Sequence, residues 1–379
     1  MITLKKNNND YDIKKIFKHP MINNTAYNPP LKEGGLTRLY MNENLFGPTP
    51  KIIEALKDLK PNYLYMYGFG CEKDAILMEC LSQFLGLCEN NIILNNGEAS
   101  VIQQIIVSVI DKDDLLYMPQ YGWPYYESTA MLCGGVVKKF NICCNNHQFW
   151  YDSCSIICDI GIQNPKIIVL VSPNMPTGNS ISAQNDIELL AKKYEKTLII
   201  VDEAYFGFSY DYNIDIGHMI SNYPNVIFLR TFSKFYALAG LRVGYAICNE
   251  SLNSILKKSS PLFGIGTLQQ IACKIAIEDK SYYNTMRDQF NNVKNYFIEE
   301  VNKIENFYAF LSDGNFVLIK VNNFNAEKII VFLKLNGYLI RECSSYGLIN
   351  YIRISIGTRE NMENILKLLI EFAARAEKN

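Results

Sequence analysis

The middle of the chain alternates between short apolar runs and longer amphipathic stretches. Near-continuous apolar runs occupy residues 166–173, 197–206 and 225–232. Apolar residues recur at helical spacing in residues 99–110 and in residues 185–196, which lie between the first two runs. Strands that are apolar throughout are buried on both faces, and the helices between them are the crossovers of parallel sheets. The pattern therefore predicts an α/β fold whose large domain contains a mostly parallel sheet.

After about residue 262 the pattern changes to a different order of elements. Helix-like and strand-like stretches follow one another there, at residues 282–304, 314–321, 326–337, 351–357 and 359–378. That order is typical of a smaller α+β domain. The first forty residues are rich in Asn, Lys and Pro and have little periodicity. We therefore expect an N-terminal arm at residues 1–45, a large domain at 46–262 and a small domain at 263–379.

The composition narrows the class of protein. Of the 379 residues, 49% are hydrophobic and 20% are charged, which is ordinary for a soluble globular chain. The 37 basic and 38 acidic residues give a formal net charge of −1, and no long block of one sign indicates a nucleic-acid or anionic-membrane surface. We therefore expect a small-molecule ligand or a second copy of the chain as partner, with no nucleic acid and no membrane.

The cysteines and the N-terminus predict a cytoplasmic location. The 11 cysteines are scattered, with neither a CxxC zinc pattern nor a disulfide framework. The first twenty residues contain no apolar core for a signal peptide, and no run has the length of a membrane span. His19, His147 and His218 are too few and too dispersed for a metal site, so we expect no metal.

Polar residues follow directly after each of the three apolar runs. Open α/β sheets bind ligands beyond the carboxyl ends of their strands, so these residues are candidates for a site. The segments are SPNMPTG (172–178), DEAY (202–205) and TFSK (231–234). For Lys234 two interpretations compete. In the first, the ammonium group lies in water and the aliphatic part of the side chain packs on apolar surface. In the second, the amine is desolvated and its pKa is lowered, so that it is a nucleophile that can hold a carbonyl cofactor as a Schiff base.

Other side chains near these segments also have two interpretations. Asp202 ends a buried strand and needs a compensating partner, which is either a structural arginine or the protonated nitrogen of a pyridine ring. Tyr205 either hydrogen-bonds an oxygen of the same ring or packs at the sheet edge. In the loop PQYGWPYY, Tyr121 is a candidate to stack on a flat ring, whereas Trp123 and Tyr125 are expected to form an aromatic cluster.

An anion site is indicated at the start of a predicted helix. Gly97, Glu98 and Ala99 open that helix, and its first amides and positive dipole end suit a phosphate. A plain helix cap is the alternative interpretation. Ser233 adds a hydroxyl group, and Arg242 adds a guanidinium fork of the kind that binds phosphate through two hydrogen bonds.

Motifs in a fixed order connect these candidates. They are NENLFGP (42–48), NGEA (96–99), SPNMPTG (172–178), DEAY (202–205), SKFYALAGLRVGY (233–245) and YIRISIGT (351–358). This set resembles the fold type I, pyridoxal-phosphate (PLP)-dependent aminotransferases of class I/II, in particular the histidinol-phosphate aminotransferases. The similarity extends from about Asn42 to the C-terminal helix, and the combination of Asp-x-x-Tyr, Ser-Lys and Gly-Leu-Arg is highly specific.

The resemblance implies a role in cofactor binding for each matching residue. Lys234 would form the Schiff base with PLP and then move a proton, Asp202 would hold the pyridinium, and Tyr205 would bind the ring hydroxyl. Tyr121 would stack on the ring. The other expected cofactor contacts are Gly97, Glu98, Ala99, Asn174, Thr231, Ser233 and Arg242.

The resemblance also predicts a homodimer and a substrate site. Tyr67 is expected to reach the cofactor phosphate of the neighbouring subunit, which implies shared active sites. Arg353 is expected to bind the anionic group of the substrate, with assistance from Arg341. The substrate would be a small phosphorylated carbonyl compound or amino alcohol, such as imidazole-acetol phosphate or dihydroxyacetone phosphate, with glutamate and 2-oxoglutarate as the second pair.

Several positions depart from the family pattern. Met175 stands where an asparagine usually precedes Pro-Thr-Gly, although Asn174 is its neighbour. Leu45 and Phe46 stand where Pro and Tyr are frequent, and Tyr67 is followed by glycine where proline is usual. These changes leave the cofactor prediction in place and leave the identity of the substrate open.

Other activities were weighed against this one. The stretches NNGEAS and SKFYA also resemble phospho-amino-acid decarboxylases, such as threonine-phosphate decarboxylase, which break the bond from Cα to the carboxylate where aminotransferases break the C–H bond. A PLP-dependent decarboxylase of phosphoserine or phosphothreonine is therefore the alternative. A nicotinamide-dependent dehydrogenase needs a third glycine that YGFGCEK lacks, and a cofactor-sensing regulator needs a DNA-binding domain in addition.

Overall fold

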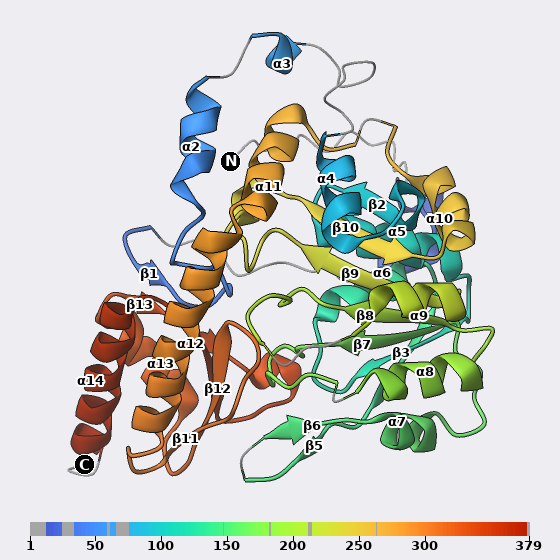
Figure 1. Ribbon diagram of the computed structural model, residues 1–379. Helices are drawn as coiled ribbons and strands as arrows, with labels where there is room; N and C mark the ends of the chain where they lie inside the picture. Colours follow the sequence, from blue (N-terminus) through green and yellow to red (C-terminus); the bar gives the residue numbers. More distant parts are fainter. Residues whose placement is uncertain are drawn as a thin grey trace, which may run out of the picture.

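A seven-stranded sheet with the order β2-β10-β9-β8-β7-β3-β4 forms the centre of the larger part of the molecule (Figure 1). Its strands are β2 (Ile92–Asn95), β3 (Leu115–Pro119), β4 (Val136–Phe140), β7 (Ile167–Val171), β8 (Leu198–Asp202), β9 (Val226–Thr231) and β10 (Gly244–Cys248). Strand β10 runs antiparallel to both of its neighbours, and the other neighbouring pairs are parallel. The predicted mostly parallel sheet is therefore confirmed.

The structure, a computed structural model, describes residues 13–24, 34–58, 61–65, 76–146, 148–181, 183–210, 214–262 and 264–376. Within this described part of the chain, no helix has both the length and the apolar content that crossing a membrane requires.

Helices cover both faces of the large sheet. One face is covered by α5 (Glu98–Val109), α6 (Pro124–Leu132) and α10 (Glu250–Leu256), and the other by α7 (Ser153–Ile160), α8 (Gln184–Lys193) and α9 (Ile216–Asn222). In β7, Ile167 and Val169 point into the core on the α5 side, while Ile168 and Leu170 point into the core on the α8 side. Burial on both faces explains why these strands are apolar at every position.

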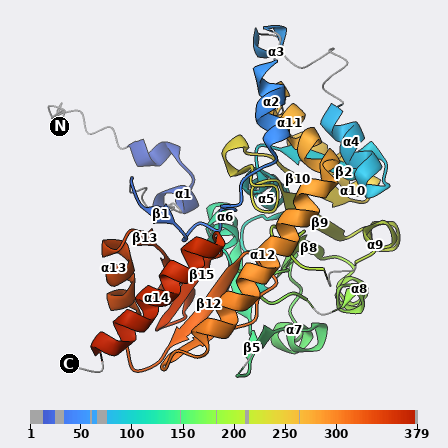
Figure 2. The same ribbon diagram turned by 60° about the vertical axis from the view of Figure 1, so that its left-hand side comes forward.

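A second sheet, of four antiparallel strands, lies beside the first (Figure 2). Its order is β11 (Phe307–Ala309), β12 (Phe316–Val321), β15 (Tyr351–Ser355) and β14 (Arg341–Glu342). The helices α12 (Lys280–Val301), α13 (Ala326–Leu335) and α14 (Arg359–Ala376) pack together against it. These elements match the stretches that the periodicity marks after residue 262.

The division into an arm and two domains stays a prediction. Helix α11 (Thr267–Glu278) lies after the expected boundary, yet it packs on α2 (Pro50–Lys57) and α4 (Ile76–Leu85) before that boundary. The remaining elements are the helices α1 (His19–Asn23) and α3 (Asn62–Tyr65), the hairpin of β5 (Cys143–Cys144) and β6 (Phe149–Trp150), and five short 3-10 helices at Ile13–Ile16, Glu89–Asn91, Ala239–Leu241, Lys257–Ser259 and Ser344–Tyr346.

The N-terminal segment joins the two sheets. Strand β1 (Thr37–Arg38) pairs in parallel with β13 (Tyr338–Leu339), next to the four-stranded sheet. The chain then continues towards the carboxyl ends of β8 and β9, where the polar residues that follow the apolar runs are brought together. We call residues 37–44 the crossing segment. Strand β1 has two residues, which is too short a stretch for an alternating apolar pattern to predict it.

Candidate active site

A cavity of about 810 Å³ lies where the crossing segment passes the carboxyl ends of the central strands. The predicted site residues that line it are Glu98, Ala99, Asp202, Tyr205, Thr231, Ser233, Lys234, Arg242, Arg341 and Arg353. Residues separated by up to 255 positions in sequence (Glu98 to Arg353) therefore share one cavity. Tyr67 lies outside the described residues.

Lys234 projects from the loop after β9 into this cavity. Its Nζ donates a hydrogen bond to the carbonyl oxygen of Met41, 2.8 Å away, and lies 5.9 Å from the centre of the Tyr205 ring. Burial, reinforced by the nearby Arg353 guanidinium, lowers the pKa of Lys234 to about 8. A substantial fraction of this amine is therefore neutral close to physiological pH, which a nucleophilic lysine requires.

Asp202, the last residue of β8, has a buried side chain that accepts two hydrogen bonds. Its Oδ2 accepts a hydrogen bond from the hydroxyl of Tyr126 at 2.9 Å, and its Oδ1 accepts one from the amide of Ala204 at 3.0 Å. No ion pair links it to a basic side chain of the described residues, since Arg230 pairs with Glu203. Burial raises the pKa of Asp202, and the two hydrogen bonds oppose that shift. The carboxylate is thus held ready for a cationic ligand.

Glu98 contributes its side chain as well as its backbone. Burial and the neighbouring carboxylate of Asp202 raise its pKa well above the ordinary value. Its Oε1 is buried without a hydrogen-bond partner among the described residues. We therefore expect Glu98 to be a neutral acid that shares a proton with Asp202. The NGEA motif does not indicate that the Glu98 side chain lies beside Asp202. The motif suggests a function only through the backbone amides at the helix start.

Tyr205 lies on the crossing-segment side of the cavity. Its hydroxyl accepts a hydrogen bond from Nδ2 of Asn42 at 2.8 Å, and its ring meets Phe316 edge to face at 5.1 Å. Asn42 is held in turn by Ser355, whose hydroxyl donates to its Oδ1. The residue adopts a positive φ of 53°, which asparagine tolerates better than most side chains. The NENLFGP motif contains Asn42, but nothing in its spacing indicates this contact.

A cup of donors lies at the start of α5. Gly97 has a φ of +82°, and a Cβ atom there would overlap with the guanidinium of Arg242. Arg242 donates to the hydroxyl of Ser233 at 3.3 Å, and the Thr231 hydroxyl donates to the same oxygen at 3.0 Å. Together with the first amides of the helix, beginning at Glu98, these groups make a cup suited to a phosphate.

Of the aromatic residues in the loop PQYGWPYY, Trp123 and Tyr125 line the cavity and stack on each other at 4.9 Å. Tyr121 is not among the lining residues and meets Phe149 edge to face at 6.3 Å. The amide nitrogen of Asn174 donates to the carbonyl of Tyr121 at 2.8 Å and to Thr177, so it holds the loop.

Met175 lines the cavity, whereas its neighbour Asn174 is not among the lining residues. A thioether replaces the amide that the family motif usually has there, so the wall offers no strong hydrogen-bond donor at this point. The aromatic pair of Trp123 and Tyr125 presents a flat apolar surface to the same cavity.

Two arginines on adjacent strands of the four-stranded sheet also line the cavity. Arg341 on β14 is the direct cross-strand partner of Arg353 on β15. Like charges in this position destabilise a sheet unless an anion joins them. Arg353 donates from Nη2 to the carbonyl of Tyr40 at 2.6 Å, and the Nε atoms of both arginines are buried with no partner among the described residues. The pair is therefore prepared for an anionic ligand.

These observations fit PLP. The buried carboxylate of Asp202 suits a pyridinium nitrogen, the partly neutral amine of Lys234 suits an aldehyde, and the cup around Arg242 suits a phosphate. All three groups line the same cavity.

Comparisons with known proteins agree with this geometry. Residues 35–369 match the family model "Aminotransferase class I and II". The chain is 30% identical over 347 residues to a histidinol-phosphate aminotransferase of Methanocaldococcus jannaschii, covering 90% of each chain. It is 33% identical over 338 residues to that of Bacillus licheniformis, covering 88% of this chain and 90% of the relative.

Solved structures show the same fold. The histidinol-phosphate aminotransferase of Sinorhizobium meliloti in complex with pyridoxal-5'-phosphate superposes with a TM-score of 0.80 at 24% identity, covering 90% of this chain and 91% of that one. The L-threonine-O-3-phosphate decarboxylase of Porphyromonas gingivalis superposes with a TM-score of 0.75 at 20% identity, covering 89% of this chain and all of that one. The chain thus belongs to the class I and II aminotransferases and is a PLP-dependent enzyme of fold type I.

Proposed function

We propose that this aminotransferase acts on a small phosphorylated ketone or amino alcohol, of the histidinol-phosphate type or smaller, with glutamate and 2-oxoglutarate as the second pair. The observation that carries the proposal is the cross-strand pair of Arg341 and Arg353, which lines the same cavity as Lys234. A compact substrate can then place its amine at Lys234 while its anionic group lies at the two arginines.

When bound, PLP supplies the carbonyl that exchanges the amino group and the ring that withdraws electrons from the substrate. We propose that Lys234 holds it covalently and that Asp202 and Tyr205 hold the ring nitrogen and the ring hydroxyl. The phosphate would lie in the cup formed by Gly97, Glu98, Ala99, Thr231, Ser233 and Arg242. Tyr121 would stack on the ring, and Asn174, which donates to the Tyr121 carbonyl, would hold that loop beside the cofactor.

Lys234 also has a role in moving protons. When it is not attached to the cofactor, its Nζ would transfer a proton to and from the substrate carbon, and the lowered pKa of about 8 suits that role. Asp202 and Glu98 line the same cavity, but Asp202 is assigned to the pyridinium and Glu98 to the phosphate cup. We therefore propose Lys234 as the general base and acid.

Two departures from the family pattern bear on the size of the substrate. Leu45 and Phe46 are partly buried apolar residues packed against the core, at positions where Pro and Tyr are frequent in the family. Neither residue lines the main cavity, and neither side chain offers a polar contact to an imidazole ring. Dihydroxyacetone phosphate, which yields serinol phosphate, has the same carbonyl and phosphate groups and needs no imidazole pocket, so we propose it beside imidazole-acetol phosphate.

We further propose a cytoplasmic homodimer with shared active sites and the division at about residue 262. Exposed apolar side chains support a dimer contact in the region before Tyr67: Ile53 on α2 and Leu64 and Tyr65 on α3 are each more than half exposed. A surface of this kind is typical of a subunit interface, and Tyr67 would extend from it towards the partner's cavity.

The substrate is tested by following the absorbance spectrum of the PLP-loaded protein after adding glutamate, histidinol phosphate, serinol phosphate or O-phosphoserine in separate cuvettes. An aminotransferase converts its cofactor to pyridoxamine phosphate with glutamate and with one amino alcohol phosphate, and the responding compound identifies the substrate. If glutamate has no effect while O-phosphoserine releases carbon dioxide and the original spectrum returns, the enzyme is a decarboxylase. The Lys234→Ala variant is the control for changes that do not arise in this cavity.

A further inference from the structure

Arg38 lines the same cavity as Arg341 and Arg353 and has no role assigned to it above. It lies on β1, where its register partner is Leu339, two residues before Arg341. Two residues after Arg38, the carbonyl of Tyr40 accepts the hydrogen bond from Arg353. The crossing segment thus brings Arg38 to the wall that Arg341 and Arg353 also line.

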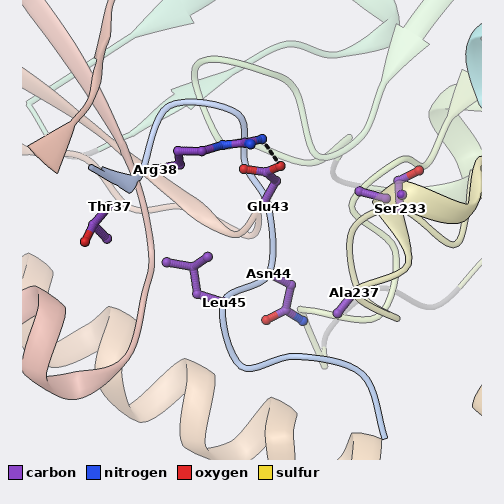
Figure 3. A pocket seen from close by; sticks show the side chains of 9 residues that line it. Thr37, Arg38, Glu43, Asn44, Leu45, Ser233 and Ala237 are labelled. Carbon is purple, nitrogen blue, oxygen red and sulfur yellow. Dashed lines mark hydrogen bonds and ion pairs between the residues drawn. The ribbon is translucent and has the colours of Figure 1, made fainter. Parts of the chain in front are cut away.

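The guanidinium of Arg38 is only partly satisfied by the protein. It forms an ion pair with Glu43, and Figure 3 shows the two side chains pointing towards each other inside the bend of the crossing segment. Its Nε is buried and has no hydrogen-bond partner among the described residues. The two side chains are 33% and 28% exposed, and an ion pair so open to water contributes little to stability. Arg38 can therefore exchange Glu43 for another anion at small cost.

The pair of Arg38 and Glu43 stands between two cavities. Both residues line the main cavity and a second cavity of about 450 Å³, which also contains Asn44, Leu45 and Ala237 (Figure 3). The ion pair is therefore exposed to both cavities. The position suits a side chain that selects the ligand by its charge.

The charges left for a substrate match a doubly charged anion. Of the charged side chains that line the main cavity, those of Glu98, Asp202, Lys234 and Arg242 are assigned above to the cofactor. The others are the guanidinium groups of Arg38, Arg341 and Arg353 and the carboxylate of Glu43, which together have an excess of two positive charges. A phosphate monoester carries nearly two negative charges at neutral pH and offers three oxygens to planar donor forks. A carboxylate carries one charge and two oxygens, so it leaves one of the three arginines unsatisfied.

We propose that Arg38 is a specificity-determining residue, which exchanges Glu43 for the substrate phosphate and so makes the cavity favour phosphate monoesters over carboxylates. This inference rests on the proposed function, because it assumes that a phosphorylated substrate binds at Arg341 and Arg353. No covalent step is involved. The exchange replaces one ion pair inside the protein by one between protein and substrate.

The proposal is tested with the PLP-loaded wild-type enzyme and the variants Arg38→Gln, Arg38→Lys, Glu43→Gln and Arg359→Gln. KM and kcat are measured for the phosphorylated substrate found above and for glutamate. Arg359→Gln is the matched control, since Arg359 also pairs with a carboxylate, that of Glu363, but lies on the exposed surface of α14. Thermal melting of each variant establishes that it folds.

We expect Arg38→Gln to raise KM for the phosphorylated substrate about tenfold or more, because a hydrogen-bonded charge is lost, and to change KM for glutamate by about twofold at most. Arg38→Lys should give an intermediate KM. Glu43→Gln should leave KM for the phosphorylated substrate unchanged or lower, because the bound state no longer uses that ion pair.

Other results would overturn the proposal. Equal increases in KM for Arg38→Gln and Glu43→Gln would mean that the ion pair only holds the crossing segment in place. No increase with Arg38→Gln, in an enzyme that turns over the phosphorylated substrate, would also overturn it while leaving the proposed function intact. If the wild-type enzyme accepts glutamate but no phosphorylated amine, the proposed function fails and this inference fails with it.

Discussion

The hydroxyl of Tyr126 donates a hydrogen bond to Oδ2 of Asp202 across 2.9 Å, and both side chains are buried. The two residues are 76 positions apart and come from helix α6 and strand β8. This bond opposes the effect of burial on the pKa of Asp202, whose other oxygen accepts from a backbone amide. A carboxylate that must stay ionised against a pyridine ring is stabilised by such donors.

Replacing Tyr126 by phenylalanine should therefore raise the pKa of Asp202 and weaken PLP binding. A hydrogen bond to a charged group contributes about 1.5–3 kcal/mol, so we expect an affinity about ten times lower or worse. Titration of the apo-protein with PLP, followed by absorbance, measures the change. Tyr223→Phe is the matched control, because the Tyr223 hydroxyl also donates to a carboxylate, that of Glu188 at 2.9 Å, but Tyr223 does not line the cavity. Equal affinity of Tyr126→Phe and wild type would contradict this role.

The pKa of Lys234, about 8 and lowered from 10.5, predicts how fast PLP attaches at different pH. Below that pKa the amine is mostly protonated and unreactive, so the rate should rise about tenfold per pH unit up to pH 8 and level off above it. Arg353 contributes to the lowering, so Arg353→Gln should move the midpoint to higher pH. Stopped-flow absorbance measures the profile. A midpoint near 10 in the wild-type protein would show that Lys234 is not desolvated.

Substitution of Gly97 by alanine should damage the phosphate cup. A Cβ atom at this positive φ would overlap with the guanidinium of Arg242 and push it away from Ser233. Because a charged, hydrogen-bonded donor is displaced, we expect PLP affinity to fall about tenfold or more. Gly264→Ala is the control, since no heavy atom beyond its chain neighbours lies within 4 Å of the added carbon. If both variants bind PLP like the wild type, the cup does not hold the phosphate.

Glu98 should tolerate glutamine and not alanine. Burial and Asp202 raise its pKa well above the ordinary value, which favours the neutral acid, and glutamine is a neutral donor of nearly the same shape. We expect kcat/KM of Glu98→Gln within about threefold of wild type, and about tenfold lower for Glu98→Ala because Asp202 then loses a partner. A large loss in Glu98→Gln would mean instead that Glu98 acts as an anion.

The sequence predicts those parts of the fold and site that depend on local pattern. The apolar runs of β7, β8 and β9 identify buried parallel strands, and such strands place Asp202 and Lys234 at one edge of the sheet. Asn42 and Arg38 were not predicted as site residues because their roles depend on how the crossing segment passes over the sheet, which is a contact between residues far apart in sequence.

Tyr126 is a similar case. The periodicity of α6 does not distinguish Tyr126 from the other tyrosines of PQYGWPYY. Only the packing of α6 against β8 shows that the Tyr126 hydroxyl is the one that reaches Asp202. Tyr121 and Asn174, which the motifs mark, hydrogen-bond each other and are not among the residues that line the cavity, so their predicted contacts with the cofactor stay predictions.

The central claim is that Lys234 holds the cofactor, and the most direct test is to reduce the PLP-loaded protein with borohydride and locate the modified lysine by peptide mass spectrometry. We predict a phosphopyridoxyl group on the peptide that contains Lys234, and no such group in Lys234→Ala. Lys294 provides a demanding comparison, since burial also lowers its pKa to about 8 but its Nζ donates to the carbonyl of Ser312, away from the cavity. A label on Lys294 or on any other lysine, with Lys234 unmodified, would contradict the proposed site.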